Sequence, residues 1–471
     1  MIYFMNEKNK KNPKEIVDDL KFEQILEKTI LSSPEEIEQI LIKASKKRGL
    51  SLKEVAKLCN CKDKTLINKI FKAAGAIKED IYGERIVLFA PLYVSDFCVN
   101  DCEYCGFHRR NEALRHKLSM AEVAAQTKIL IEMGHKRLLL EFGEHPKENP
   151  IDYVVDTIKT IYQTKSGNGE IRRVNVNIAA TSAKNYRKLK TAGIGTYQLF
   201  QETYHKPTFE KLHNGPKADF ERQLFAHNNA FEGGIDDLGI GVLFGLYDWR
   251  FEVLSLVSHA KYMDKHFGVG PHTISVPRFQ SANSVDFQSD YPVSEDELLK
   301  IIAILRLAVP YTGMIISTRE RPEIRTKAFE LGISQTSAAS KVDVGGYKSH
   351  EKGILTCGQF STHDGRTVDQ IVRSLCEEDL LPSFCTACYR KGRTGEKFME
   401  IAKPGNIHNF CRPNGILTFK EYLIDYATPE TKKEGERVLN KYLALIPSEE
   451  IKTETKTRLK RIEDGERDLY F

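Results

Sequence analysis

Three cysteines lie close together early in the chain, as Cys98, Cys102 and Cys105. In a reducing compartment, thiols grouped in this way are more often metal ligands than disulfide partners. A [4Fe–4S] cluster has four irons, so three thiolates would leave one iron open to bind a cofactor or substrate. A structural zinc site, with His108 as the fourth ligand, is the alternative.

A second group of three cysteines lies far downstream, where Cys385 and Cys388 form a CxxC pair and Cys411 follows after 22 intervening residues. No fourth cysteine is near enough to complete the set, because we expect Cys376 to be buried in a helix as a small hydrophobic side chain. The pattern predicts a second iron–sulfur site. A zinc site completed by His408 is the alternative.

The elements that must position these cysteines alternate regularly. Apolar runs predict strands, and segments with apolar residues at spacings of three and four predict a helix between each pair. The predicted strands are 85–93, 137–142, 172–178, 196–200, 238–244, 272–276, 313–317 and 333–336, and the helices are 121–133, 151–164, 183–191, 219–231, 250–266, 295–308 and 321–331. This alternation predicts an α/β fold, a (β/α)8 TIM-type barrel. The first cysteines would then follow strand one, at the face where barrels carry active sites.

The regions on either side of this pattern predict three parts. Residues 1–80 predict a helical N-terminal extension, residues 81–340 the barrel, and residues 341–471 a mostly helical C-terminal domain with the second cysteine group. In the last part, the glycine-rich stretch after residue 344 predicts a loop, and helices resume near 368–378 and 419–427. The charged segment 430–468 is either a solvated helix or a partly disordered tail.

The composition argues against several classes of partner. A net charge of +5 on 471 residues is too small to indicate nucleic-acid binding. No stretch approaches the ~20 apolar residues that span a bilayer, and the N-terminus lacks the apolar core of a signal peptide. We therefore expect a cytoplasmic protein that binds neither nucleic acid nor membrane.

Taken together, the two cysteine groups resemble those of the aromatic-amino-acid lyases of the radical S-adenosylmethionine (SAM) superfamily. CxxxCxxC directly after strand one, with Tyr104 before its last cysteine, is typical of the superfamily. The CxxC-x22-C tail is typical of the two-cluster tyrosine lyases of [FeFe]-hydrogenase maturation. The resemblance covers residues 80–427, and its longest segments are RIVLFAPLY (85–93), RRVNVNIAA (172–180), LFQETYH (199–205), GVGPHTIS (268–275) and PYTGM (310–314).

The resemblance implies a [4Fe–4S] cluster on the first three cysteines. Its open iron would bind SAM, which a low-potential electron donor would cleave to a 5′-deoxyadenosyl radical. Only Gly143 and Glu144 match the family's glycine-containing segment, which binds the SAM amino group. Arg278 would meet the SAM carboxylate, although an Arg in a simple salt bridge is the alternative. Glu202 and His205 are candidates for contacts to SAM or to a phenol.

The resemblance also implies a substrate, L-tyrosine, whose Cα–Cβ bond is broken to give p-cresol and dehydroglycine. Arg319 would bind the substrate carboxylate, with Ser317 and Thr318 adding hydrogen bonds.

The second cluster, on Cys385, Cys388 and Cys411, would convert dehydroglycine to CO and cyanide. These would leave as an Fe(CO)(CN) synthon for assembly of the hydrogenase H-cluster, together with the maturation partner proteins. This auxiliary cluster has an additional iron, for which we assign His272 as a ligand. A core histidine that donates to a backbone carbonyl is the alternative, and His266 is a less favoured ligand.

Two other functions compete with this one. The single-cluster tyrosine lyase of thiamine-thiazole synthesis shares the barrel but not the cysteine tail. A zinc-stabilised scaffold without catalysis would use the same thiols as structural ligands.

Overall fold

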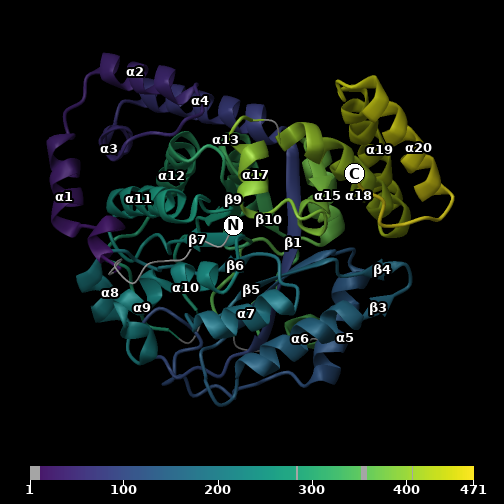
Figure 1. Ribbon diagram of the computed structural model, residues 1–471, viewed down its shortest axis with the longest axis horizontal. Helices are drawn as coiled ribbons and strands as arrows, with labels where there is room; N and C mark the ends of the chain where they lie inside the picture. The colour runs from purple at the N-terminus through teal and green to yellow at the C-terminus, as the bar shows by residue number, and fades with distance from the viewer. Residues whose placement is uncertain (1–10, 283–284, 352–357, 406) are drawn as a thin grey trace.

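The structure is a computed structural model that describes residues 11–282, 285–351, 358–405 and 407–471, and its centre is a closed parallel barrel (Figure 1). The strands are β1 (Arg85–Ser95), β2 (Arg137–Phe142), β5 (Arg173–Asn177), β6 (Tyr197–Gln198), β7 (Leu238–Gly241), β8 (Thr273–Ser275), β9 (Gly313–Ile316) and β10 (Gln335–Ser337). β10 pairs back onto β1, with Val87 opposite Gln335. The predicted (β/α)8 barrel is confirmed.

The barrel strands follow the predicted apolar runs, but several are shorter. β1 is buried over all its residues, as expected for a strand covered on both faces. β6 and β7 end early, because the chain leaves regular pairing at Glu202, where an isolated bridge to Val242 remains. Glu202 has a φ of 68°, in the left-handed region that side chains rarely adopt. Strand ends that stop pairing in this way turn their side chains towards the barrel mouth.

Helices cover the outside of the barrel, and several of them begin at a side-chain cap. They are α5 (Met120–Glu132), α6 (Ile151–Gln163), α7 (Ala183–Thr191), α8 (Lys206–Leu212), α9 (Phe220–Leu224), α10 (Ala226–Glu232), α11 (Trp249–Phe267), α12 (Glu295–Ala308) and α13 (Pro322–Leu331). Capping boxes at Ser119–Glu122 and Ser294–Glu297 start α5 and α12. The predicted helix 219–231 is two helices, because Phe225 leaves helical geometry between α9 and α10.

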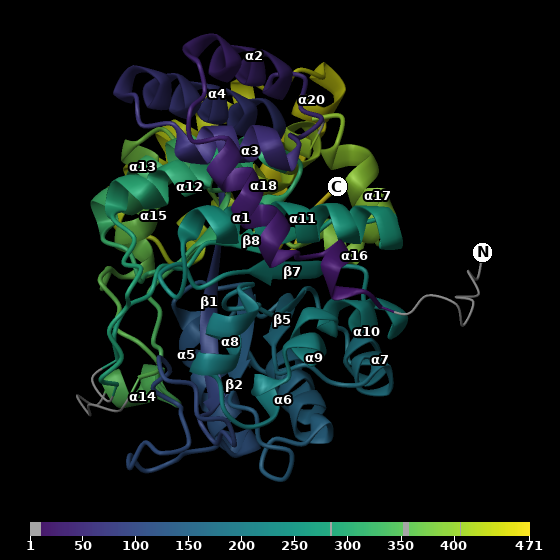
Figure 2. The same cartoon turned by 90° about the vertical axis from the view of Figure 1, so that its left-hand side faces the viewer.

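The N-terminal extension is helical, as predicted. It consists of η1 (Pro13–Glu15), α1 (Asp19–Lys28), α2 (Pro34–Ala44), α3 (Leu52–Asn60) and α4 (Lys64–Tyr82), and residues 1–10 lie outside the described chain. Its helices pack against α11, α12 and α13. Figure 2 shows α2 and α4 gathered at the same end of the barrel as the C-terminal helix α20, with α14 at the opposite end.

The C-terminal residues add a strand that the sequence did not predict. β11 (Leu381–Ser383) pairs with the start of β1, at Arg85–Val87, whereas β2 pairs with β1 from Ala90 onward. Val87 pairs with both β10 and β11, so β11 lies on the β2 edge of β1. This strand leads directly to Cys385 and fixes it at the amino ends of the barrel strands.

The rest of the C-terminal part is helical. Its helices are α14 (Gly346–Glu351), α15 (Val368–Glu377), α16 (Ala387–Arg390), α17 (Gly395–Ala402), α18 (Ile407–Asp425), α19 (Pro429–Ala444) and α20 (Glu449–Glu463). A short hairpin, β3 (Lys165–Ser166) with β4 (Gly169–Glu170), and the turn η2 (Pro216–Ala218) complete the elements. α14 begins inside the predicted loop, whose residues 352–357 lie outside the described chain.

The charged C-terminal segment forms the ordered helices α19 and α20, which pack on α18 rather than forming a loose tail. α18 begins twelve residues before the predicted helix at 419. The sequence did not predict this first part, because Pro413 and Gly415 usually interrupt helices, yet both lie within α18.

One apolar core runs from Ile16 to Ile462. The three predicted parts share that core, and the boundaries at residues 80 and 340 stay predictions. Among the described helices, none is both long and apolar enough to cross a membrane.

A buried ion pair joins α13 to the chain that follows β10. Arg325 and Asp364 are in contact with both side chains fully buried, and Arg325 also donates to Thr336 Oγ1 at 2.7 Å and to the Ser337 carbonyl at 2.6 Å. Because the pair lies in the dry interior, neither charge has water as a substitute partner.

Replacing Asp364 with Ala should therefore destabilise the fold strongly. Removing one partner of a buried ion pair costs about 3–5 kcal/mol, and we expect Asp364→Ala to lower the free energy of unfolding by that amount in a denaturant titration. Glu295→Ala is the control, because it breaks an exposed pair with Arg321 and should change stability little. Equal losses in the two variants would contradict the importance of the buried pair.

Candidate functional site

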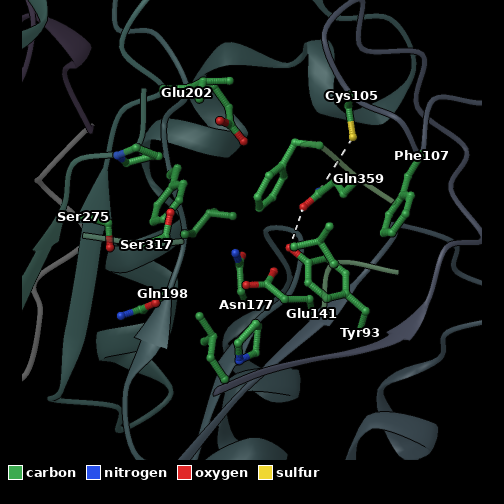
Figure 3. Close-up of a pocket in the computed structure, with 18 of the residues that line it drawn as sticks. Tyr93, Cys105, Phe107, Glu141, Asn177, Gln198, Glu202, Ser275, Ser317 and Gln359 are labelled. Carbon is green, nitrogen blue, oxygen red and sulfur yellow. Dashed lines mark hydrogen bonds between the residues drawn. The ribbon is translucent and has the colours of Figure 1, made fainter. Parts of the chain in front are cut away.

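The carboxyl ends of the barrel strands surround a large cavity, called here the carboxyl-end cavity (Figure 3). The loop after β1 brings all three first cysteines into its wall. Nine of the predicted site residues line it: Cys98, Cys102, Cys105, Gly143, Glu144, Glu202, Ser317, Thr318 and Arg319. They come from β1, β2, β6 and β9 and the loops that follow these strands, so barrel closure brings them together.

The segment at Gly143 and Glu144 supports the cysteine loop. Gly143 N donates to the Ser95 carbonyl at 2.8 Å, and Val99 N donates to the Glu144 carbonyl at 2.7 Å. A Cβ at Gly143 would lie 2.4 Å from the Phe97 carbonyl oxygen. Only glycine lets the two backbones approach this closely.

Two side-chain amides that the sequence analysis missed contact the cysteine sulfurs. Asn100 Nδ2 lies 3.8 Å from Cys98 Sγ and donates to Glu144 Oε2 at 2.7 Å. Gln359 Nε2 lies 3.7 Å from Cys105 Sγ, and its Oε1 accepts from the Tyr93 hydroxyl at 2.9 Å (Figure 3). Amide donors beside cluster sulfurs tune the reduction potential of a cluster. Gln359 had no local signal, because it lies in a predicted loop 254 residues after Cys105.

A half-buried ion pair lies beside Cys102. Lys217 Nζ is 2.7 Å from Glu202 Oε1. Burial lowers the pKa of Lys217, but Glu202 and Cys102 outweigh it and hold that pKa above its usual value. Burial raises the pKa of Cys102, and it raises that of Cys105 to about 11, so iron binding must displace protons from these thiols. Lys217 was not predicted, because its loop has no motif of its own.

Polar groups also lie deeper in the barrel. Figure 3 shows Glu141 and Asn177 side by side, pointing into the open centre of the cavity. Burial raises the pKa of Glu141 to about 8, with Arg319 opposing the shift. The Arg319 guanidinium lies over the Phe360 ring at 3.5 Å, and its side chain has no hydrogen bond or ion pair within the described chain. A partly buried guanidinium whose Nε has no acceptor suits a carboxylate ligand.

Two predicted residues lie outside this cavity. His205 stacks on Tyr247 with ring centroids 3.7 Å apart, and its Nδ1 contacts Thr208. Arg278 pairs with Glu320 at 2.5 Å and lines a neighbouring cavity instead. The salt bridge is the alternative that the sequence left open for Arg278.

The amino ends of the strands surround a second cavity, called here the amino-end cavity. Cys385, Cys388, Cys411 and His272 all line it, although they lie on different parts of the chain. β11 delivers Cys385, α16 holds Cys388 and α18 holds Cys411. The neighbouring Cys388 thiol holds the pKa of Cys411 below its usual value, against the effect of burial. The predicted second thiol group and its histidine are thus brought together.

His272 is suited to bind metal. Burial lowers its pKa to about 4, so the ring is neutral at pH 7 as a metal ligand must be. Its Nδ1 lies 3.8 Å from Asp237 Oδ1, and its ring packs on Phe398 at 4.0 Å. Among the described residues, no backbone carbonyl accepts a hydrogen bond from this ring. His266, the other candidate, pairs with Glu15 outside the cavity.

Three arginines at strand starts enclose the amino-end cavity, namely Arg85, Arg137 and Arg173. Arg137 donates to the Cys385 carbonyl at 2.8 Å. The end of the chain supports the same loop, because Asp468 binds Arg390 through two contacts of 2.5 Å just after Cys388. None of these basic residues was predicted, because nothing local distinguishes them from surface arginines.

Comparison with known proteins decides the family. The chain matches the model of the radical SAM superfamily over residues 92–255 and that of the Biotin and Thiamin Synthesis associated domain over residues 275–381. A crystal structure of HydG, a maturase of the [FeFe]-hydrogenase, is 54% identical with a TM-score of 0.94, over 97% of this chain and 100% of that one. The chain belongs to the HydG family of radical SAM proteins.

Other relatives agree with this placement. HydG from Carboxydothermus hydrogenoformans is 40% identical with a TM-score of 0.84, over 96% of this chain and 100% of that one. The 2-iminoacetate synthase of Salmonella typhimurium is 30% identical over 318 residues, which are 67% of this chain and 82% of the relative.

Membership of the HydG family and its superfamily implies a [4Fe–4S] cluster and SAM, and the carboxyl-end cavity fits both. Its three thiols are the residues that would hold the cluster, and its open space adjoins Gly143 and Glu202. His108, the fourth ligand in the zinc alternative, has its Nδ1 3.3 Å from Asp101 Oδ1. Across the described residues, no three Cys, His, Asp or Glu side chains stand close enough to hold a single ion. The thiolates of a cluster bind separate irons and stand further apart. The side chain of His408 lies outside the described residues.

Gly143→Ala should disrupt the first cluster site. The added methyl must push the Phe97 carbonyl away and shift the loop that holds Cys98. We expect bound iron after reconstitution to fall by about the content of one cluster, with loss of SAM cleavage. Gly365→Ala is the control, because nothing lies within 4 Å of its added Cβ. Full iron content in Gly143→Ala would contradict this role of the glycine.

Proposed function

We propose that this protein is a two-cluster tyrosine lyase of [FeFe]-hydrogenase maturation. It would cleave L-tyrosine to p-cresol and dehydroglycine, and convert dehydroglycine to CO and cyanide for an Fe(CO)(CN) synthon. The observation that carries the proposal is the presence of three thiols at each end of one barrel, with His272 beside the second set. A single-cluster lyase has no use for the second set.

The relatives support the same chemistry. One is a maturase of the [FeFe]-hydrogenase. Another is a 2-iminoacetate synthase, and 2-iminoacetate is dehydroglycine under another name. A low-potential electron donor and hydrogenase maturation proteins are the partners that this function requires.

The atoms and electrons balance. When bound, SAM and its cluster would supply one-electron chemistry that removes a hydrogen atom from the tyrosine amine. Breaking the Cα–Cβ bond then leaves dehydroglycine and a hydroxybenzyl radical, which gains one electron and one proton to become p-cresol. Dehydroglycine has the atoms of CO, HCN and water, so its conversion needs no further oxidant.

The residues of the carboxyl-end cavity have separate tasks in this reaction. Arg319 binds the tyrosine carboxylate, helped by Ser317 and Thr318, and holds the amine towards the adenosyl group. The backbone at Gly143 and Glu144 and the carboxylate of Glu202, which line the cavity, would hold SAM. His205 stacks on Tyr247 and Arg278 pairs with Glu320, both outside the cavity, so we assign neither a contact to SAM.

Cysteine variants test the two sites separately. Changing Cys98, Cys102 or Cys105 to Ser should abolish SAM cleavage and p-cresol formation, because the first cluster is lost. Changing Cys385 and Cys388 to Ser should leave p-cresol largely intact and stop CO release. Both products are measured anaerobically with tyrosine, SAM and a strong reductant. Cys61→Ser is the control thiol. Unchanged CO output without Cys385 and Cys388 would refute the proposal.

Arg319→Met tests substrate binding. Because a hydrogen-bonded ion pair is lost, we expect kcat/KM for tyrosine to fall by about tenfold to a hundredfold. Slow SAM cleavage without p-cresol should remain, since the cluster ligands are untouched. Arg319→Lys should recover part of the loss, because it keeps the charge but not the fork of donors. Wild-type kcat/KM in Arg319→Met would exclude this residue as the carboxylate ligand.

A further inference from the structure

The carboxyl-end cavity has one carboxyl group without a charged partner among the described residues. Three carboxyl side chains line this cavity, those of Glu141, Glu144 and Glu202. Glu144 Oε1 lies 2.6 Å from an Arg222 nitrogen, and Glu202 Oε1 lies 2.7 Å from Lys217 Nζ. Glu141 forms no ion pair within the described chain, and the described residues that line the cavity include no histidine or aspartate. Glu141 is therefore the carboxyl group that is left to exchange a proton with a ligand.

The groups that face Glu141 come from several strands of the barrel. Glu141 pairs in register with Tyr93 of β1 and Asn177 of β5, and Figure 3 shows it beside Asn177 in the open centre of the cavity. The charges of Arg319, after β9, and Glu202, after β6, also act on it. Burial is the main cause that raises the pKa of Glu141 to about 8, while Arg319 and a hydrogen bond from Asn177 oppose it. The free carboxyl group is thus mostly neutral at pH 7 and ionises readily.

The substrate of the proposed lyase needs a base. The reaction removes a hydrogen atom from the tyrosine amine, which in water at pH 7 is a positively charged ammonium group. Removing a hydrogen atom from an ammonium group would leave its charge on an electron-poor nitrogen, so the amine must first lose a proton. Arg319 and Glu141 each affect the other's pKa, so they lie in the same part of the cavity. A tyrosine carboxylate on Arg319 brings the amine, which is attached to the same carbon, into that part too.

We propose that Glu141 is the acid–base residue of the lyase, which accepts the ammonium proton of bound tyrosine and later returns it to the hydroxybenzyl fragment. The inference rests on the proposed function. In the first step an N–H bond of the ammonium group breaks and the O–H bond of Glu141 forms, which leaves a neutral amine. After the Cα–Cβ bond has broken, the hydroxybenzyl radical gains one electron from the low-potential donor. The proton of Glu141 then forms the last C–H bond of the p-cresol methyl group, and Glu141 is a carboxylate again.

The surroundings of Glu141 favour this transfer. Once the tyrosine carboxylate neutralises Arg319, the guanidinium stabilises the carboxylate of Glu141 less, so Glu141 holds a proton more strongly. Away from water, a carboxylic acid beside a neutral amine also avoids the cost of burying two charges. Tyr93 is not an alternative base, because its hydroxyl donates to Gln359 Oε1 and burial raises its pKa well above the usual value.

Proton release on tyrosine binding tests the transfer without turnover. Tyrosine is titrated calorimetrically at pH 7 into the anaerobically reconstituted protein with SAM and no reductant, in two buffers that differ in ionisation enthalpy. Free Glu141 and the free ammonium group hold one dissociable proton each, whereas the bound pair shares one, so we expect release of about one proton. The isosteric variant Glu141→Gln should release none. The wild type should also release none with 3-(4-hydroxyphenyl)propionate, which lacks the amine.

Glu252→Gln is the matched control. Burial raises the pKa of Glu252 to about 8 as well, but this residue lies outside the cavity, where it accepts hydrogen bonds from the Thr203 hydroxyl and, at 2.9 Å, from Tyr204 N. Proton release on tyrosine binding should be the same in Glu252→Gln as in the wild type.

The pH dependence of p-cresol formation tests the role of Glu141 in turnover. In the wild type the shared proton moves within the complex, so kcat should change little between about pH 7 and 9. In Glu141→Gln the amine must lose its proton to water, so kcat should fall about a hundredfold at pH 7 and recover by about tenfold per pH unit. Glu141→Asp keeps a carboxyl group and should retain part of the activity. A merely structural defect would not be repaired by raising the pH.

The proposal is overturned by equal proton release in the wild type and Glu141→Gln, by its equal loss in Glu252→Gln, or by parallel pH profiles of kcat in the wild type and Glu141→Gln. The last result, with p-cresol formed, leaves the lyase standing and removes Glu141 from its mechanism. If the wild type releases the proton on binding tyrosine but forms no p-cresol, the lyase fails, whereas the contact between Glu141 and the amine stands.

Discussion

The pairing of β1 along both of its edges is the constraint on which the rest of the structure depends. Its first half pairs with β10, which closes the barrel, and with β11, while its second half pairs with β2. β1 has 11 residues. At ~3.3 Å per step between neighbouring residues, it is roughly 33 Å long from end to end. The loop with Cys98 leaves one end of this strand, and Cys385 follows the strand that pairs with the other end. A single strand therefore holds the two thiol groups apart and facing opposite mouths.

Because the two thiol groups lie at opposite mouths of the barrel, the residues around them form two different environments. The carboxyl-end cavity carries the partly buried side chains of Glu141 and Arg319 among its lining residues. The amino-end cavity differs in size and charge, with three guanidinium groups and a neutral imidazole around its thiols. In a parallel barrel, all strands begin at one mouth and end at the other. The first residues of the strands therefore line the amino-end cavity, and their last residues line the carboxyl-end cavity.

Several polar contacts hold the cysteine loops from distant parts of the chain. Gln359 reaches Cys105 from the C-terminal part, and Asp468 holds Arg390 beside Cys388. Such contacts fix loops that have no regular structure of their own and whose ligands must keep their geometry when iron binds. The helix that holds Cys411, α18, is in turn packed against both α19 and α20.

The sequence alone determined the alternation of strands and helices, the barrel class and both cysteine groups, because periodicity and close spacing are local properties of the chain. It also placed Arg319, Gly143 and His272 at strand ends where the structure finds them. Only the tertiary structure decided that His272 meets Cys385, that Arg278 pairs with Glu320, and that Glu141 has no charged partner within the described chain. It also revealed β11, whose three residues are too few to show a period. These features depend on contacts between residues hundreds of positions apart, which form when the barrel closes and which no local pattern encodes.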